Sequence, residues 1–228
     1  MARQAQAPGA ILQSGLAALA LPAALAPALS AYLDELEKWN GAYNLTAVRD
    51  RGEMVTRHLL DSLAMHPHIE GPLLDVGSGA GLPGIPLAIA RPELRVTVLD
   101  GMRPHLQAVW KYLPTESRRR FLRHAVRALG LANVEVVEAR VEDYRPAEPF
   151  ARVTSRAFAS LKDFFALSAH LPAADGQWLA MKGKLDPQET QDLPAGVGIV
   201  DIKPLQVPGL AEARHLVVAA RKAAAVSA

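Results

Sequence analysis

The stretch LLDVGSGAGLPG, residues Leu73 to Gly84, decides the fold of this chain. Four residues, three of them apolar, lead directly into four glycines within eight positions. A short apolar run that ends in a glycine-rich turn is typical of a buried parallel strand leading into a helix. Glycine lacks a Cβ, so backbone N–H groups can approach a ligand closely there. In an open α/β sheet, this strand end is where a nucleotide-like ligand is expected.

Downstream of the glycine turn, the pattern alternates between strands and helices. The predicted strands are Arg95–Asp100, Val134–Val137, Val153–Arg156, Trp178–Met181, Ile199–Ile202 and His215–Ala219. The predicted helices are Ile85–Ala90, Pro104–Leu113, Glu116–Leu129 and Leu161–Leu171. This alternation indicates a mostly parallel sheet with right-handed crossovers. Because no helix separates the last two strands, we expect them to form an antiparallel hairpin at the sheet edge.

Upstream of the turn, the chain reads as a helical appendage. We predict helices over Ile11–Leu21, Ala26–Trp39 and Glu53–Met65, and divide the chain into a helical subdomain, residues 1–66, and a ligand-binding domain, residues 67–228. His58 and Asp61 are three residues apart in the third helix, so they either pair with each other or contact a ligand. Prolines interrupt the apolar N-terminal residues, so we expect neither a targeting segment nor a membrane span.

Composition excludes some chemistry and suggests a partner. The chain has no cysteine, which excludes disulfides, thiolate metal sites and a cysteine nucleophile, and suits a reducing cytoplasm. His66-Pro67-His68 has no carboxylate cluster nearby, so we predict a loop and no metal site. Formal charge is only +2, yet six arginines and one lysine stand between residues 103 and 127 against one acid. Such a run attracts a polyanion or forms a solvated helix face.

The glycines fit two ligand-binding patterns. Residues 79–84 match the G-x-G-x-x-G pattern of dinucleotide-binding proteins, with Asp100 where a ribose-binding acid belongs. However, the strand runs directly into Gly77, and Pro83 would interrupt the turn that opens the helix. The alternative pattern begins at Asp75 and continues through Gly77, Gly79 and Gly81; it resembles motif I of S-adenosylmethionine (SAM) dependent methyltransferases. Since the terminal hairpin also fits the class I methyltransferase order, we favour SAM over NAD.

Seven motifs in order narrow the resemblance. They are Trp39–Thr46, Arg57–Leu63, Asp75–Pro86, Arg140–Glu142, Ser155–Ala159, Met181–Gly183 and Arg214–Val218. Together they resemble the ribosomal RNA small subunit methyltransferase G family, also called glucose-inhibited division protein B. The resemblance implies a Rossmann-like class I methyltransferase with a seven-stranded sheet. It also implies a cytoplasmic enzyme that methylates N7 of one guanine in 16S ribosomal RNA. Since nothing in the sequence resembles an obligate dimer patch, we expect a monomer without a membrane partner.

The resemblance also implies a set of site residues. Its SAM-contacting positions correspond to Gly77, Leu82, Val141, Glu142 and Arg156, to which the motif adds Gly79, Gly81 and the ribose-binding Asp100. Arg156 is the candidate for positioning the reacting groups, and no general base is required because guanine N7 carries a free lone pair. We expect the small ribosomal subunit RNA to contact Arg119, Arg120, Arg123, Lys182, Arg214 and His215.

Two departures from the family pattern and two alternatives stay open. About a dozen extra residues, around Arg103–Thr115, separate the second strand from the basic helix; we expect them to extend a helix and add RNA-facing charge. An acid usual near Ala151 is absent, which leaves the partner of Arg156 open. The alternatives are an NAD(P)-binding oxidoreductase and a non-catalytic SAM-sensing RNA-binding module.

Overall fold

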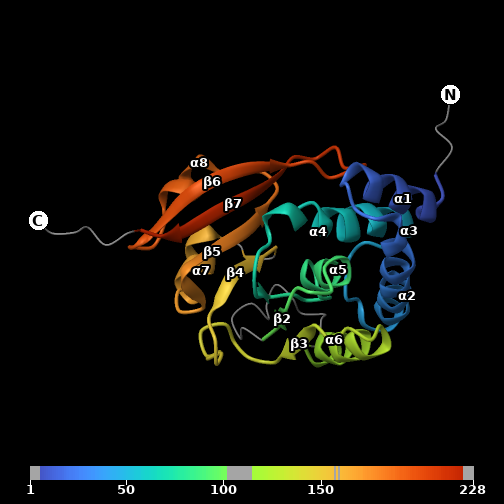
Figure 1. The fold of residues 1–228 in the computed structure, drawn as a ribbon, viewed down its shortest axis with the longest axis horizontal. Helices are drawn as coiled ribbons and strands as arrows, with labels where there is room; N and C mark the ends of the chain where they lie inside the picture. The colour runs from blue at the N-terminus through green and yellow to red at the C-terminus, as the bar shows by residue number, and fades with distance from the viewer. Residues whose placement is uncertain (1–5, 102–114, 157, 159, 223–228) are drawn as a thin grey trace, which may run out of the picture.

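A seven-stranded sheet forms the centre of the protein (Figure 1). The structure is a computed structural model that describes residues 6–101, 115–156, 158 and 160–222. The strand order is β3-β2-β1-β4-β5-β7-β6. The strands are β1 (Leu73–Val76), β2 (Val96–Leu99), β3 (Val134–Val137), β4 (Phe150–Ser155), β5 (Pro172–Lys182), β6 (Val197–Leu205) and β7 (Arg214–Arg221). The order confirms the predicted class I methyltransferase sheet.

Strand β1 lies in the middle of the parallel part of the sheet. It pairs in parallel with β2, where Leu73 lies opposite Val96, and with β4, where Leu73 lies opposite Arg152. All four of its residues are buried, as expected for a strand covered on both faces. Leu73 and Leu74 belong to different hydrophobic clusters because successive side chains point to opposite faces. The glycine turn therefore begins at the centre of the sheet edge.

The predicted C-terminal hairpin is confirmed. Strand β7 pairs antiparallel with both β5 and β6, so its first residue lies at the edge where the parallel strands end. His215, for example, lies opposite Lys182, the last residue of β5. The hairpin thus brings residues from near the C-terminus to the same edge as the glycine turn.

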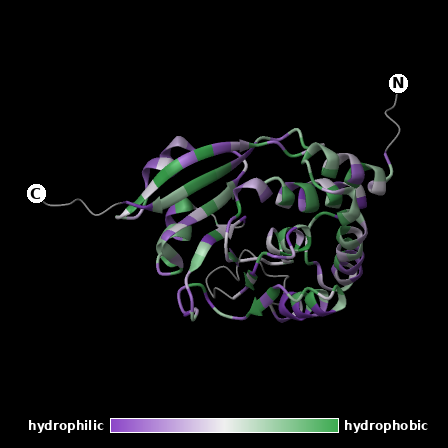
Figure 2. Cartoon of the chain, viewed as in Figure 1, coloured by the Kyte–Doolittle hydropathy of each residue, from purple (hydrophilic) through white to green (hydrophobic). Residues whose placement is uncertain are grey.

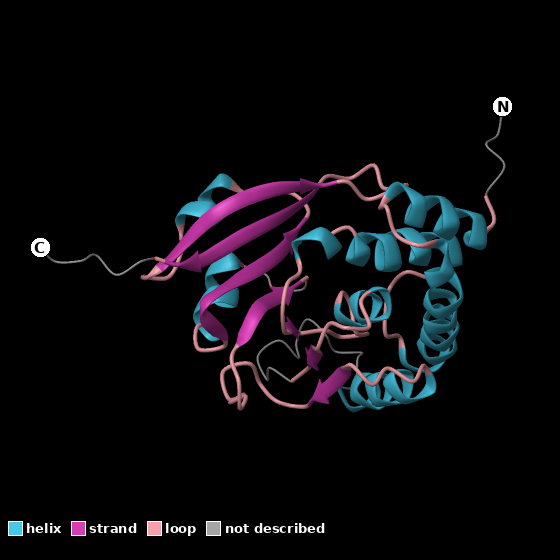
Figure 3. Ribbon diagram, in the orientation of Figure 1, coloured by secondary structure: helices cyan, strands magenta, loops and turns pink. Residues whose placement is uncertain are grey.

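The helices cover the two sheet faces unequally (Figures 1 and 3). The N-terminal helices, α5 and α6 contribute to one hydrophobic cluster, and α7 contributes to the other. The helices are α1 (Pro8–Ala18), η1 (Ala23–Leu25), α2 (Ala26–Tyr43), α3 (Arg51–Met54), η2 (Val55–Leu60), α4 (Asp61–Leu63), η3 (His66–His68), α5 (Gly84–Ala90), α6 (Thr115–Ala128), α7 (Leu161–Leu167) and α8 (Pro187–Gln191). None of the described helices is both long enough and apolar enough to cross a bilayer.

The N-terminal helices share a hydrophobic core with the sheet. Leu12 of α1 and Leu33 of α2 belong to the same buried cluster as Val98 of β2 and Leu216 of β7. Figure 2 shows mostly hydrophobic colour along β7, whereas α6 carries long hydrophilic stretches. The N-terminal helices therefore pack as part of the sheet's cover, and a domain boundary at residue 66 stays a prediction.

Several elements differ from the predictions. The expected helix Glu53–Met65 is three consecutive segments, α3, the π-helical η2 and α4. β5 begins at Pro172 rather than Trp178, because Phe150 pairs with Pro172 across an irregularity in the β4–β5 register. α8 was not expected at all. The expected helix Pro104–Leu113, within the extra segment Arg103–Thr115, lies outside the described residues.

Candidate functional site

The glycine turn leaves β1 at the carboxyl edge of the sheet. Gly77, Gly79 and Gly81 all have positive φ, at +71°, +58° and +87°. The N–H groups of Gly77 and Ser78 both donate to the carbonyl oxygen of Leu99, at 2.8 and 3.2 Å. Since Leu99 is the last residue of β2, the turn is held directly beside Asp100.

Close packing explains why the end of this turn requires glycine. A Cβ at Gly81 would lie 2.4 Å from Cδ1 of Ile85, in addition to the strain of its positive φ. A Cβ at Gly84 would lie 2.9 Å from Oδ2 of Asp75. That same carboxylate oxygen accepts a hydrogen bond from the Gly84 N–H at 2.8 Å. Asp75 of β1 thus fixes the position of Gly84, the first residue of α5.

Two buried carboxyl groups lie at this edge, and each has one oxygen that is not hydrogen-bonded to a described residue. Within the described residues, Oδ1 of Asp75 and Oδ2 of Asp100 have no hydrogen-bond partner. Burial raises the pKa of Asp75 to about 7, partly offset by the Gly84 N–H and Arg156. Burial also raises the pKa of Asp100 to about 6, against the opposing effect of Arg118 and Arg119. A ligand that brings hydroxyl donors or positive charge favours the ionised carboxylates, and a nucleoside sulfonium brings both.

The loop after β3 lies beside the end of β2. A Cβ at Gly101 would lie 2.0 Å from the carbonyl oxygen of Ala139, so the two backbones touch. Val141 is buried in this loop, and Glu142 forms an ion pair with Arg140. The loops after β1, β2 and β3 therefore place all the predicted cofactor residues except Arg156 at one edge: Gly77, Gly79, Gly81, Leu82, Asp100, Val141 and Glu142.

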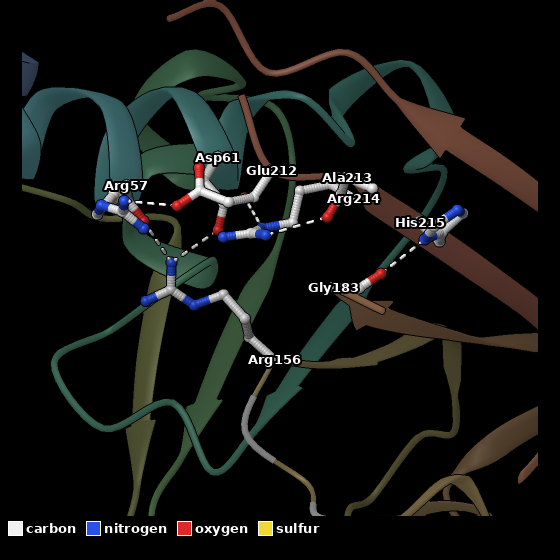
Figure 4. Close-up of polar contacts among 8 residues, drawn as sticks. All are labelled: Arg57, Asp61, Arg156, Gly183, Glu212, Ala213, Arg214 and His215. Carbon is white, nitrogen blue, oxygen red and sulfur yellow. Dashed lines mark hydrogen bonds and ion pairs between the residues drawn. The ribbon is translucent and has the colours of Figure 1, made fainter. Parts of the chain in front are cut away.

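Arg156 follows the last residue of β4 and reaches the N-terminal helices (Figure 4). Its Nη1 donates to Oδ2 of Asp61 at 3.1 Å and to the carbonyl oxygen of Arg57 at 3.0 Å. The preceding residue, Ser155, donates to the carbonyl oxygen of Val76 at 2.8 Å, which ties this strand end to the glycine turn. Asp61 therefore supplies the partner that the sequence left open for Arg156.

The start of β7 supplies two further predicted residues (Figure 4). Arg214 donates from Nε to Oδ1 of Asp61 at 3.0 Å, and Nδ1 of His215 lies 2.7 Å from the carbonyl oxygen of Gly183. Lys182 forms a 2.6 Å ion pair with Glu189 of α8, and both side chains are largely buried. The structure therefore gathers Lys182, Arg214 and His215 at the carboxyl edge near Arg156.

The three predicted RNA contacts on α6 lie apart from that cluster and have carboxylate partners. Arg119 and Arg123 both pair with Glu138, which follows β3, while Arg120 pairs with Glu116 one helical turn earlier. Arg118 and Arg119 lower the pKa of Asp100 through their charge, so the start of α6 lies near the cofactor edge.

Sequence reasoning missed how the N-terminal helices support the site. The sequence left open whether Asp61 pairs with His58 or contacts a ligand; in the structure its two oxygens bond Arg156 and Arg214. Nε2 of His58 instead lies 2.9 Å from the hydroxyl of Thr46. Burial lowers the pKa of His58 to about 4, and the charge of Arg156 adds to the effect. The Arg57–Leu63 motif indicated that these residues matter, but nothing in it identified their distant partners.

Solved structures with the same fold define the class of protein. TrmN from Thermus thermophilus superimposes with a TM-score of 0.52 at 18% identity, over 74% of this chain and 53% of that one. The glycopeptide N-methyltransferase MtfA, complexed with S-adenosyl-L-homocysteine, gives 0.53 at 13% identity, over 71% and 87%. At these identities the likeness concerns the fold alone. The chain has the fold of the class I SAM-dependent methyltransferases.

Sequence relatives narrow the class to one family. A family model, GidB, described as rRNA small subunit methyltransferase G, matches residues 26–217. The ribosomal RNA small subunit methyltransferase G of Stenotrophomonas maltophilia is 48% identical over 209 residues, which cover 91% of this chain and 92% of that protein. Its namesake from Chromobacterium violaceum is 48% identical over 210 residues, covering 90% and 94%. The chain belongs to the rRNA small subunit methyltransferase G family.

Proposed function

We propose that this protein transfers a methyl group from SAM to N7 of one guanine in the 16S RNA of the small ribosomal subunit. The observation that carries the proposal is the glycine turn beside the buried Asp100, in a chain of this family. For a protein of this family we also propose a cytoplasmic location. We expect it to act as a monomer, which sedimentation of the purified protein tests.

The cofactor side is formed by the loops after β1, β2 and β3. The backbone of Gly77, Gly79 and Gly81 would hold the methionine part of SAM, where a side chain would block access. Asp100 accepts hydrogen bonds from the ribose hydroxyls, because one carboxylate can take two such bonds from a diol. Leu82, Val141 and Glu142 would contact the adenosine part of SAM. When bound, SAM supplies an electrophilic methyl group on a positively charged sulfur.

The acceptor side requires geometry rather than proton transfer. Guanine N7 has an in-plane lone pair and carries no proton, so no side chain has to act as a base. The protein contributes by holding the nucleophile and the methyl carbon in line and close together. Arg156 is the positioning candidate, since it directly follows the end of β4, which Ser155 ties to the glycine turn, and its guanidinium is fixed by Asp61 and the Arg57 carbonyl. This chemistry is compatible with a chain that has no cysteine.

The RNA side uses the basic residues at and around the carboxyl edge. Arg119, Arg120 and Arg123 of α6 contact phosphates and position the RNA without reading its sequence. Lys182, Arg214 and His215 contact the strand next to the target nucleotide. The target base has to leave its stack to reach the methyl group, which costs less in a loop than in a helix.

Transfer of labelled methyl groups tests the proposal. The protein is incubated with methyl-labelled SAM and small ribosomal subunits from cells that lack the endogenous methyltransferase, and separately with naked 16S RNA. Label on guanine N7, located by nuclease digestion and chromatography, supports the proposal. Label confined to protein or to small molecules excludes it. Tight binding of SAM and RNA without methyl transfer would identify a non-catalytic SAM-sensing RNA-binding module. Saturable NADH binding together with hydride transfer would identify an oxidoreductase.

A further inference from the structure

Three segments that are distant in sequence meet at one buried carboxylate. Arg57 and Asp61 come from the N-terminal helices, Arg156 from the end of β4, and Arg214 from the start of β7 (Figure 4). The Asp61 side chain is only 5% exposed, and each of its oxygens accepts a bond from a different arginine. A buried carboxylate shared by two guanidinium groups fixes both of them relative to each other.

Additional bonds restrict each arginine. Besides Asp61, Arg156 donates to the backbone carbonyl of Arg57 at 3.0 Å, and Arg214 donates to the carbonyl of Ala213 at 3.1 Å. Arg57 itself forms a 2.7 Å ion pair with Glu212, two residues before Arg214. These bonds join the helical segment that carries Asp61 to the end of β4, which carries Arg156, and to the start of β7, which carries Arg214. The arrangement resists independent motion of the two guanidinium groups.

The two arginines come from different parts of the site. Arg156 directly follows Ser155, whose hydroxyl donates to the carbonyl oxygen of Val76 at 2.8 Å just before the glycine turn, so Arg156 belongs to the cofactor side. In agreement, its charge lowers the pKa of Asp75. Arg214 neighbours His215, which lies opposite Lys182 in the β5–β7 pairing, so it belongs to the edge assigned above to RNA. Asp61 is therefore the common partner of a cofactor-side arginine and a substrate-side arginine.

We propose that Asp61 is a positioning residue for methyl transfer, holding Arg156 at the cofactor and Arg214 at a phosphate of the RNA strand beside the target guanosine. The inference rests on the proposed function and adds a phosphate subsite at Arg214. The cluster holds three arginines and two carboxylates, so it retains one excess positive charge at this edge. That excess suits a phosphodiester. Because one carboxylate fixes both guanidinium groups, the position of the strand is set relative to the methyl donor.

Four variants test this role in the full-length enzyme. Asp61→Asn removes the charge at nearly constant volume, Arg214→Gln removes the phosphate contact, and the double variant combines them. Asp34→Asn is the matched control, because Asp34 of α2 forms an exposed ion pair with Arg51 away from this cluster. Each variant is measured for kcat, KM for small-subunit RNA, Kd for SAM and thermal midpoint.

A positioning role predicts a specific, non-additive pattern. Asp61→Asn lowers kcat by about tenfold or more, since small misplacements of reacting groups are costly. It also raises KM for RNA by about tenfold, the cost of about one charge-assisted hydrogen bond. Arg214→Gln raises KM to a similar extent while Kd for SAM stays within about twofold of wild type. The double variant shows no further rise in KM, because both changes remove the same contact.

A merely structural role predicts different results. If Asp61→Asn lowers only the thermal midpoint, or if its effect on KM adds fully to that of Arg214→Gln, the positioning role is wrong. If Arg214→Gln leaves KM unchanged, the phosphate subsite is wrong. Failure of the proposed function is distinguishable from these outcomes, because it is measured on the wild-type enzyme. If the wild-type enzyme places no label on guanine N7, the proposed function is wrong, whatever the variants do.

Discussion

The hydroxyl of Tyr32 donates a hydrogen bond to the carbonyl oxygen of Ala80 at 2.6 Å. Tyr32 lies in α2 and Ala80 in the glycine turn, so this bond connects the N-terminal helices directly to that turn. The tyrosine is fully buried, and its burial raises the pKa of the phenol well above the usual value. The phenol therefore stays protonated and keeps donating throughout the physiological pH range.

Tyr32→Phe removes this hydrogen bond and leaves the ring in place. The Ala80 carbonyl then loses a buried donor, which costs about 1–3 kcal/mol of unfolding free energy in urea denaturation. Because the carbonyl belongs to the glycine turn, we expect the affinity for SAM, measured by calorimetry, to fall several-fold as well. Tyr43→Phe is the matched control, since Tyr43 is exposed at the end of the same helix. Equal affinities for SAM in the two variants would show that Tyr32 does not support the turn.

The sequence predicted the elements whose signals are local. β1 and the glycine turn combine a buried apolar run with glycines, and β2 alternates β-branched residues before Asp100. Both were placed within one or two residues of their observed bounds. The C-terminal hairpin followed from two apolar strands separated by prolines and a glycine. Each of these patterns depends only on residues that are close in sequence, so the elements can be predicted without knowing any contact between distant segments.

The parts that sequence missed depend on contacts between distant segments. The first half of β5, Pro172 to Gln177, is not rich in β-branched residues; it is a strand because β4 pairs with part of it. The π-helical turn at Val55–Leu60 has no strong local signal. Asp61 meets Arg156 and Arg214 across 95 and 153 residues of sequence, so its role in the site was visible only in the fold.

Gly84→Ala and Gly41→Ala should have opposite effects on stability. A Cβ at residue 84 would lie 2.7 Å from Cγ1 of Val98 and 2.9 Å from Oδ2 of Asp75, so overpacking should cost about 1–3 kcal/mol. Gly41 lies in α2 with nothing within 4 Å of an added Cβ. Alanine there should stabilise the helix by about 0.5–1 kcal/mol.

Urea denaturation of both alanine variants measures the contrast. We also expect Gly84→Ala to weaken SAM binding, because it displaces the carboxylate that fixes the start of α5. Gly41→Ala should bind SAM as the wild type does. A Gly84→Ala variant as stable as the wild type would mean that the glycine turn tolerates the added methyl group without rearrangement.

Asp100 should make both stability and SAM binding depend on pH. Its pKa is about 6 in the folded protein against an ordinary value of 3.8. Between about pH 4 and pH 6 the folded chain therefore holds a proton that the unfolded chain has released, and the free energy of unfolding falls as pH rises. SAM binding should respond in the opposite direction, because the ionised carboxylate is the better acceptor for ribose hydroxyls. The affinity of the protein for SAM should rise about tenfold from pH 5 to pH 8.

The Asp100→Asn variant distinguishes the contribution of Asp100 to the pH dependence from that of Asp75. The variant should lose the share of Asp100 in the stability change between about pH 4 and pH 6. It should retain the share of Asp75, which extends from about pH 4 to about pH 7, because burial raises the pKa of Asp75 to about 7. Calorimetry at several pH values measures SAM affinity in both proteins. An unchanged pH dependence of binding in the variant would remove Asp100 from the ribose site.

Two exposed arginines provide a matched test of the RNA surface. Arg120 of α6 is 66% exposed and pairs with Glu116; Arg95, just before β2 at the opposite sheet edge, is 71% exposed and pairs with Glu148. Arg120→Ala should weaken RNA binding and reduce the slope of log affinity against log salt by about 1, because one phosphate contact is lost.

Arg95→Ala should change neither the affinity nor the slope, since the amino ends of the parallel strands face away from the glycine turn. Filter binding of 16S RNA between 50 and 200 mM salt, roughly the range over which such contacts weaken strongly, measures both variants. Equal losses in the two would mean that the RNA responds to overall charge rather than to α6. A loss confined to Arg95→Ala would place the RNA on the opposite edge of the sheet.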